Sequence, residues 1–256
     1  MSKGTKLLFK SGNASLVGKV LQPLNSCSST NEWLKENTMP HGTVVYTTHQ
    51  QAGRGQRGNT WQDRPGENLA LSVLLSDLLL PVTEAFLLNK AIAVAVHDVV
   101  QALAGPSLAL KWPNDVMWRD RKLAGILIEN QLQGQKVAQS IIGIGINADV
   151  PAFGPDLPQA TSLRLITGQA HPPTRLVDPL VAALRYRLTQ LHEGDTVALD
   201  QAYHKRLYHL GVARLFALAG QEKWGIIKCV TDGGQLLVAW GDDQEDAYTH
   251  GTISWR

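Results

Sequence analysis

The clearest strand pattern in this chain is Ser140-Ile141-Ile142-Gly143-Ile144-Gly145-Ile146-Asn147. Alternate residues of a strand point to opposite faces, so the isoleucines at even-numbered positions share one face and Gly143 and Gly145 lie on the other. An isoleucine face that packs into a core, backed by a bare glycine face, predicts a floor on which a flat apolar ligand can lie. Close packing of a helix on the two glycines is the alternative interpretation. Asn147 ends the strand on the glycine side, where its amide can hydrogen-bond that ligand or a phosphate.

The segments around this strand predict an α+β fold, a mixed sheet packed with helices. Patterns rich in β-branched or alternating apolar residues predict strands over 43–49, 68–75, 107–111, 115–118, 122–130 and 136–146. Apolar residues at spacings of three and four predict helices over about 29–37, 83–104, 178–192 and 199–207. The proline-rich stretch 151–173 is expected to form a loop.

The pattern changes after residue 210, where short strands alternate with turns rich in Gly and Asp. Strands are predicted over 212–219, 224–230, 235–240 and 247–254. Strands of this length and spacing are typical of a small β-barrel. The sequence therefore predicts two domains, a larger one over 1–208 and a small barrel over 209–256.

Composition narrows the function classes. The chain has 256 residues and a formal net charge of +2, which argues against a protein that binds nucleic acid mainly through charge. Cys27 and Cys229 lie far apart in the sequence, a spacing that forms neither a disulfide framework nor a zinc site. The apolar stretch 69–80 is interrupted by polar residues and is too short to span a membrane. We expect a cytoplasmic protein.

A glycine-punctuated basic loop runs from Gln51 through Gly53-Arg54-Gly55-Gln56-Arg57-Gly58-Asn59 to Trp61. The glycines allow tight turns that expose backbone N–H groups, the arginines add positive charge, and Trp61 offers a flat ring for stacking. These parts suit an anion that carries an aromatic group, such as a nucleotide. A flexible contact to nucleic acid and an ordinary solvated loop are the alternatives.

A second polar cluster is Lys111-Trp112-Pro113-Asn114-Asp115, followed by Lys122-Leu123-Ala124-Gly125-Ile126-Leu127. Pro113 favours a bend that places Lys111 and Asp115 at facing ends of a strand-turn-strand. Lysine, asparagine and aspartate together can hold a triphosphate and its magnesium ion. Gly125 allows a ligand to approach the backbone. A surface hairpin with scattered lysines is the alternative.

The third polar group is Ser29-Thr30-Asn31-Glu32, which has the pattern of a capping box at the start of a helix. A purely local capping role is the simplest interpretation. A ligand contact is compatible with it, because a helix N-terminus also binds anions.

Taken in order, these segments resemble the biotin protein ligase family. The resemblance is close over about 25–150 and looser over the C-terminal part. It implies a class II synthetase-like mixed sheet packed with helices, followed by a small SH3-like β-barrel. It also implies a two-step reaction, in which biotin and ATP give biotinyl-5'-AMP and pyrophosphate, and a lysine of a biotin carboxyl carrier domain then takes the biotin. ATP and biotin would be substrates, with Mg²⁺ required.

The resemblance also assigns roles to residues, with Lys122, Arg54 and Lys111 as catalytic residues. The residues implied for biotin binding are Ser29, Thr30, Asn31, Gln51, Gly53, Arg54, Gly55, Gln56, Lys122, Gly125, Gly143 and Gly145. Those implied for ATP binding are Arg57, Trp61, Lys111, Asn114 and Asn147, and Asp115 would hold the Mg²⁺.

Two departures and two competing functions accompany the resemblance. Gln56 and Asn59 stand where many relatives carry basic residues, and the first of these positions is associated with retention of the adenylate. About 25 residues precede Ser29, too few for the DNA-binding domain of some relatives, so we expect a ligase without repressor function. A homodimer is possible, with 136–146 as the candidate edge strand. A lipoate ligase or octanoyltransferase and a non-catalytic binding protein on the same fold are the competing functions.

Overall fold

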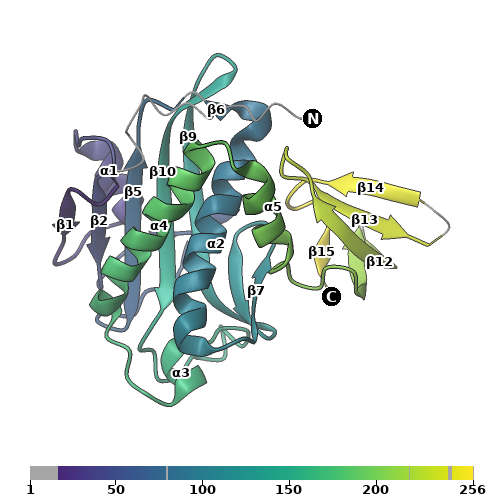
Figure 1. Cartoon of the computed structure of the whole chain (residues 1–256). Helices are drawn as coiled ribbons and strands as arrows, with labels where there is room; N and C mark the ends of the chain where they lie inside the picture. Colours follow the sequence, from purple (N-terminus) through teal and green to yellow (C-terminus); the bar gives the residue numbers. More distant parts are fainter. Residues whose placement is uncertain (1–16, 79, 219, 242–243, 256) are drawn as a thin grey trace.

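The larger of the two main sheets is mixed and has eight strands (Figure 1). The structure, a computed structural model, describes residues 17–78, 80–218, 220–241 and 244–255. Seven strands follow the order β1-β2-β5-β10-β9-β8-β7, and β6 pairs with β10. Their bounds are β1 Leu21–Pro23, β2 Val44–Thr47, β5 Asn68–Leu75, β6 Leu80–Pro81, β7 Leu108–Lys111, β8 Asp115–Trp118, β9 Arg121–Gln133 and β10 Lys136–Asn147. Only the β1–β2 pair is parallel among these. The predicted mixed sheet is confirmed.

Strand β10 lies inside this sheet. Gly143 pairs with Ser72 of β5 on one side and with Leu127 of β9 on the other. The prediction that 136–146 is an edge strand is therefore wrong, because both of its backbone edges already have antiparallel partners. The predicted homodimer loses its proposed surface and stays a prediction.

Three helices cover one face of the sheet, as Figure 1 shows. They are α2 Ala85–Ala104, α4 Val177–His192 and α5 Thr196–His204. Ile142, Ile144 and Ile146 are buried in the core on this side. The segment Val82–Ala104 is long and apolar enough to cross a membrane, yet 72% of its apolar window is buried within the fold. This segment is the central core helix, and its apolar side chains belong to the same buried core as the three isoleucines.

The opposite face carries the short helix α1 (Thr30–Glu36). Leu34 packs there with Val45, Leu74 and Ile141 in a small separate cluster. Ser29 is the N-cap residue, but its side chain makes no capping hydrogen bond, so the predicted capping box is wrong. The predicted loop 151–173 also needs correction, because it contains the helix α3 Leu163–Thr167.

The C-terminal part is an antiparallel sheet in the order β14-β13-β12-β11-β15. Its strands are β11 Ala213–Leu218, β12 Gln221–Val230, β13 Leu236–Trp240, β14 Gln244–Tyr248 and β15 Ser254–Trp255. The single strand predicted over 247–254 is wrong, because a turn with Gly251 at φ +85° separates β14 from β15. No pairing between β14 and β15 closes the sheet among the described residues, so the barrel stays a prediction. The last residue of the strand predicted over 212–219 lies outside the described residues, as do the first sixteen residues of the predicted domain 1–208.

Two polar contacts join the C-terminal sheet to the rest of the fold, one from the turn between β7 and β8 and one from helix α2. Trp112 Nε1 donates to the carbonyl of Gly234 over 2.9 Å. The ammonium of Lys90, fully buried in α2, lies 2.5 Å from Asp200 Oδ1 and 3.3 Å from the carbonyl of Val230. Buried polar groups with partners on both sides fix the relative position of the two sheets. The predicted domain boundary at 208/209 falls between α5 and β11.

Candidate functional site

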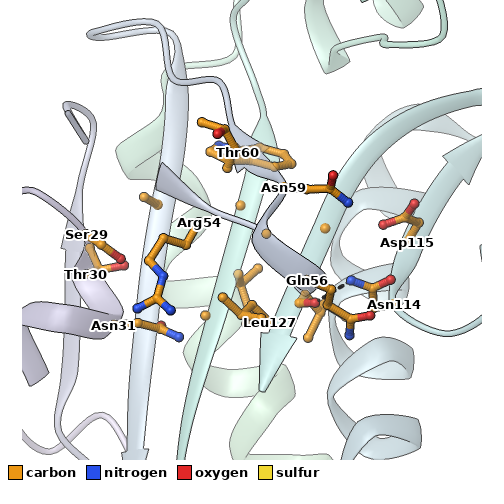
Figure 2. Close-up of a pocket in the computed structure, with 18 of the residues that line it drawn as sticks. Ser29, Thr30, Asn31, Arg54, Gln56, Asn59, Thr60, Asn114, Asp115 and Leu127 are labelled. Atoms are coloured by element: carbon orange, nitrogen blue, oxygen red, sulfur yellow. Dashed lines mark hydrogen bonds between the residues drawn. The ribbon is translucent and has the colours of Figure 1, made fainter. Parts of the chain in front are cut away.

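A cavity opens on the glycine face of the sheet, beside the start of α1 and beneath the glycine-punctuated loop. Figure 2 shows Ser29, Thr30 and Asn31 at one end and Asn114 and Asp115 at the other. Of the predicted site residues, thirteen line the cavity: Ser29, Thr30, Asn31, Arg54, Gly55, Gln56, Trp61, Asn114, Asp115, Lys122, Gly125, Gly143 and Gly145. Segments far apart in the sequence thus meet in one site.

Glycines form the floor of the cavity, where an added Cβ would clash at Gly143 and Gly145 and would make a tight contact at Gly125. A Cβ at Gly143 would lie 2.6 Å from Asn31 Oδ1, and a Cβ at Gly145 would lie 2.6 Å from Trp61 Cε2. A Cβ at Gly125 would lie 3.2 Å from Lys122 Nζ. The predicted bare face is confirmed only in part: the Trp61 indole lies over Gly145, and the Asn31 side chain of α1 lies against Gly143, as the alternative of a packed helix predicts.

The amide of Asn31 links α1 to the sheet at one end of the floor. Its Nδ2 donates to Glu129 Oε2 over 2.8 Å, and its Oδ1 accepts from the hydroxyl of Ser72 over 2.6 Å. Thr30 Oγ1 lies 2.7 Å from the same hydroxyl. This end therefore presents a hydrogen-bonded polar cluster beside an apolar floor, which suits a ligand with a polar head. Ser72 was not predicted, since a single serine in an apolar strand gives no functional signal.

Gln50, and not the predicted Gln51, reaches the cavity. Its Oε1 accepts from the backbone N–H of Thr30 over 2.9 Å, and its backbone N–H donates to Asp63 Oδ2 over 2.7 Å. Gln51 is exposed, while its own N–H is held by the carbonyl of Cys27. The assignment of Gln51 to the site is corrected, because successive side chains of this extended segment point to opposite sides.

The glycine-punctuated loop is a hairpin of β3 (Gly53–Arg54) and β4 (Thr60–Trp61). Gly53 does not line the cavity. A Cβ on it would lie 2.5 Å from the carbonyl oxygen of Trp61, so this glycine lets the two strands approach each other. Arg54 forms an ion pair with Glu32 and lies 3.7 Å from Glu129 Oε1, which ties the hairpin to α1 and β9.

Arg57 is also outside the cavity lining and has left-handed backbone geometry, with φ at 56°. A Cβ at Gly251 would coincide with the Arg57 guanidinium, so this arginine packs directly against the turn between β14 and β15. The hairpin is thus held at one end by Arg54 and at the other by Arg57.

Lys122 and Asp115 face each other at the second end of the cavity. Lys122 Nζ lies 2.6 Å from Asp115 Oδ1, in an ion pair that is not aligned as a hydrogen bond, and 5.8 Å from the centre of the Trp61 ring. Asn114 Nδ2 donates to the carbonyl of Ile126 over 2.8 Å, which holds the β7–β8 turn on β9. A half-exposed ammonium beside a carboxylate can bind an anion and a cation together.

Lys111 and Asn147 do not line the cavity, although both were predicted to bind ATP. Lys111 pairs with Asp115 across β7 and β8, as the sequence predicts, but its ammonium lies 5.5 Å from the centre of the Trp255 ring. Burial lowers the pKa of Lys111, the Asp115 carboxylate opposes this shift, and the Lys122 ammonium adds to it. The Asn147 amide is buried, accepting from Asn68 over 2.7 Å and donating to the carbonyl of Thr161 over 2.9 Å.

His250 lines the cavity and was not predicted. It belongs to the turn after β14, so its approach to the site depends on how the two sheets are docked. Nothing local in the sequence reveals that docking.

Comparison with known proteins finds biotin protein ligases. The model of the biotin/lipoate A/B protein ligase family matches residues 21–147. A biotin–[acetyl-CoA-carboxylase] ligase of Paracoccus denitrificans is 34% identical over 200 residues, covering 76% of this chain and 82% of that protein. A bifunctional ligase/repressor of Bacillus spizizenii is 35% identical over 151 residues, and the match covers 57% of this chain but 46% of that protein.

A solved structure extends the similarity to the whole fold. The biotin protein ligase from Aquifex aeolicus in complex with biotin and ATP matches with a TM-score of 0.77 and 25% identity, over 93% of this chain and 99% of that chain. Sequence and fold agree along most of the chain's length, and on these grounds the chain belongs to the biotin protein ligase family.

Proposed function

We propose that this chain activates biotin with ATP to biotinyl-5'-AMP and transfers the biotin to a lysine of a biotin carboxyl carrier domain. The observation that carries the proposal is a single cavity with a polar cluster at one end, a glycine floor, and the Lys122–Asp115 pair at the other end. A flat ring with a polar head suits the first end, and a triphosphate suits the second.

In the first step, a biotin carboxylate oxygen forms a bond to the α-phosphorus of ATP while the bond from that phosphorus to pyrophosphate breaks. Both reactants are anions, so they repel each other as they approach. The Lys122 ammonium, held beside Gly125, reduces this repulsion and stabilises the charge that builds on the phosphorus oxygens. In the second step, the amine of the carrier lysine attacks the acyl carbon and AMP leaves.

The residues at this end also fit a magnesium ion. Asp115 Oδ1 is buried and lies 2.6 Å from the Lys122 ammonium without an aligned hydrogen bond, and Asn114 lies at the same end of the cavity. Magnesium is commonly held by one or two carboxylates together with substrate phosphates, so Asp115 would be its protein ligand. When bound, the ion would neutralise charge on the departing pyrophosphate.

The test is release of pyrophosphate from ATP and magnesium, with biotin, lipoate and octanoate supplied separately. We expect release with biotin, and a fall of roughly 100- to 1,000-fold in Lys122→Ala. Lys136→Ala, at the far end of β10, is the matched control and should keep the wild-type rate. Release with lipoate or octanoate alone would move the chain to another activity of its wider family, and no release with any acid would overturn the proposal.

A further inference from the structure

The turn between β14 and β15 brings a histidine into the cavity from the C-terminal sheet. The His250 ring meets the Trp112 ring edge to face, with centroids 5.9 Å apart at 88°. Trp112 is in turn hydrogen-bonded to Gly234 in the turn between β12 and β13, which fixes the indole against the C-terminal sheet. His250 is therefore held in place at the Asp115 end of the cavity.

The imidazole of His250 has no assigned role inside the protein. Within 17–78, 80–218, 220–241 and 244–255, no hydrogen bond or ion pair is made by its ring nitrogens. A half-buried histidine with both nitrogens unpaired, in a wall shared with Asn114, Asp115 and Lys122, is available to a ligand.

We propose that His250 is a substrate-binding residue of the active site, and that it donates a hydrogen bond to a phosphate oxygen of the nucleotide. The inference rests on the proposed function and adds to it that the C-terminal sheet supplies part of the nucleotide site. The neighbouring Gly251 supports the same role for the turn, since it receives the Arg57 guanidinium and so joins the turn to the loop over the cavity.

The electrostatic surroundings agree with a phosphate ligand. Burial lowers the pKa of His250, the positive charge of Arg57 lowers it further, and the Asp115 carboxylate opposes them. The free protein therefore favours a neutral imidazole, which still carries one N–H donor. Negative phosphate charge beside the ring favours the imidazolium.

The test measures the dissociation constants of a non-hydrolysable ATP analogue and of biotin, by calorimetry on the full chain. His250→Ala and His250→Gln should weaken analogue binding roughly 10- to 100-fold and leave biotin binding unchanged. The ratio of variant to wild-type dissociation constants should be largest near pH 6 and should fall toward pH 8.5, because the imidazolium binds phosphate best. Taking this ratio cancels the titration of the analogue itself.

Thr252→Ala is the matched control in the same turn: it removes a hydroxyl that donates to the carbonyl of Thr249, but the backbone N–H keeps its own hydrogen bond to that carbonyl. It should bind both ligands like the wild type. Unchanged analogue binding in the His250 variants, equal weakening in Thr252→Ala, or weakening of biotin instead would each overturn the inference. Failure of the wild type itself to bind the analogue would overturn the proposed function, which keeps the two outcomes distinct.

Discussion

Gly145→Ala should weaken biotin binding while leaving the fold intact. The added methyl carbon would lie 2.6 Å from Trp61 Cε2 and 2.8 Å from Cζ2. That is about 1 Å inside the optimal separation of two carbon atoms. Gly145 lies in a regular strand with no positive φ, so the alanine backbone is unstrained and only space is at issue.

The size of the effect follows from which group can move. The Trp61 hairpin lies at the surface, so in the free protein the indole can retreat. When biotin is bound, the ligand and the indole need the same space above the floor. The added methyl group therefore makes the free energy of biotin binding less favourable. Overpacking of a filled site costs about 1–3 kcal/mol, which corresponds to a biotin dissociation constant raised about 5- to 150-fold.

Calorimetric titration with biotin and thermal unfolding together test this prediction. The control is Gly233→Ala, because the nearest atom to its added methyl group is Thr231 Oγ1 at 3.9 Å and its φ is not positive. A biotin dissociation constant within about twofold of the wild type would refute the argument from space. A loss of more than about 10 °C in melting temperature would show that the added methyl group destabilises the folded sheet and does not act on biotin binding alone.

Three further outcomes are expected. Gln50→Leu should weaken biotin binding about tenfold, whereas Gln51→Leu should bind like the wild type in the same titration; equal effects would contradict the assignment of Gln50. Asp200→Ala should destabilise the protein by about 3–5 kcal/mol in urea unfolding, because it removes the carboxylate nearest a buried ammonium, and Lys90→Met should cost less; the reverse order would contradict the role of this ion pair. Burial alone would raise the pKa of Asp98, yet hydrogen bonds and the charges of two arginines hold it at about 2. Since the folded pKa is depressed, this stabilisation is complete above the unfolded pKa of about 3.9 and is lost as pH falls through about 2, and the difference in free energy of unfolding between the wild type and Asp98→Asn should shrink over that window.

The sequence predicts those parts of the fold and site that depend on local pattern. The strand 68–75 and the glycine face of β10 follow from alternation, and Lys122, Gly125 and Asp115 meet because a short strand-turn-strand brings them together. These features need no knowledge of distant segments.

Features set by distant contacts could not be predicted in this way. Strand β10 lies inside the sheet and not at its edge. Alternation in the sequence could not predict this, because it does not say which strands pair. Which of Gln50 and Gln51 reaches the cavity depends on the backbone pairing of Cys27 with Gln50, two residues that lie far apart in the sequence. Lys111 turns toward Trp255, a partner from the other sheet.

The short connection from Lys111 to Asp115 contacts both the C-terminal sheet and the cavity. The Trp112 indole is hydrogen-bonded to the C-terminal sheet, and the Asp115 carboxylate faces Lys122. Cutting the chain between α5 and β11 would therefore separate Trp112 from Gly234 and would leave His250, which lines the cavity, on the second fragment. Restored biotinylation on mixing the two fragments would report fragment complementation, which makes this junction a natural place to divide the protein into a split reporter.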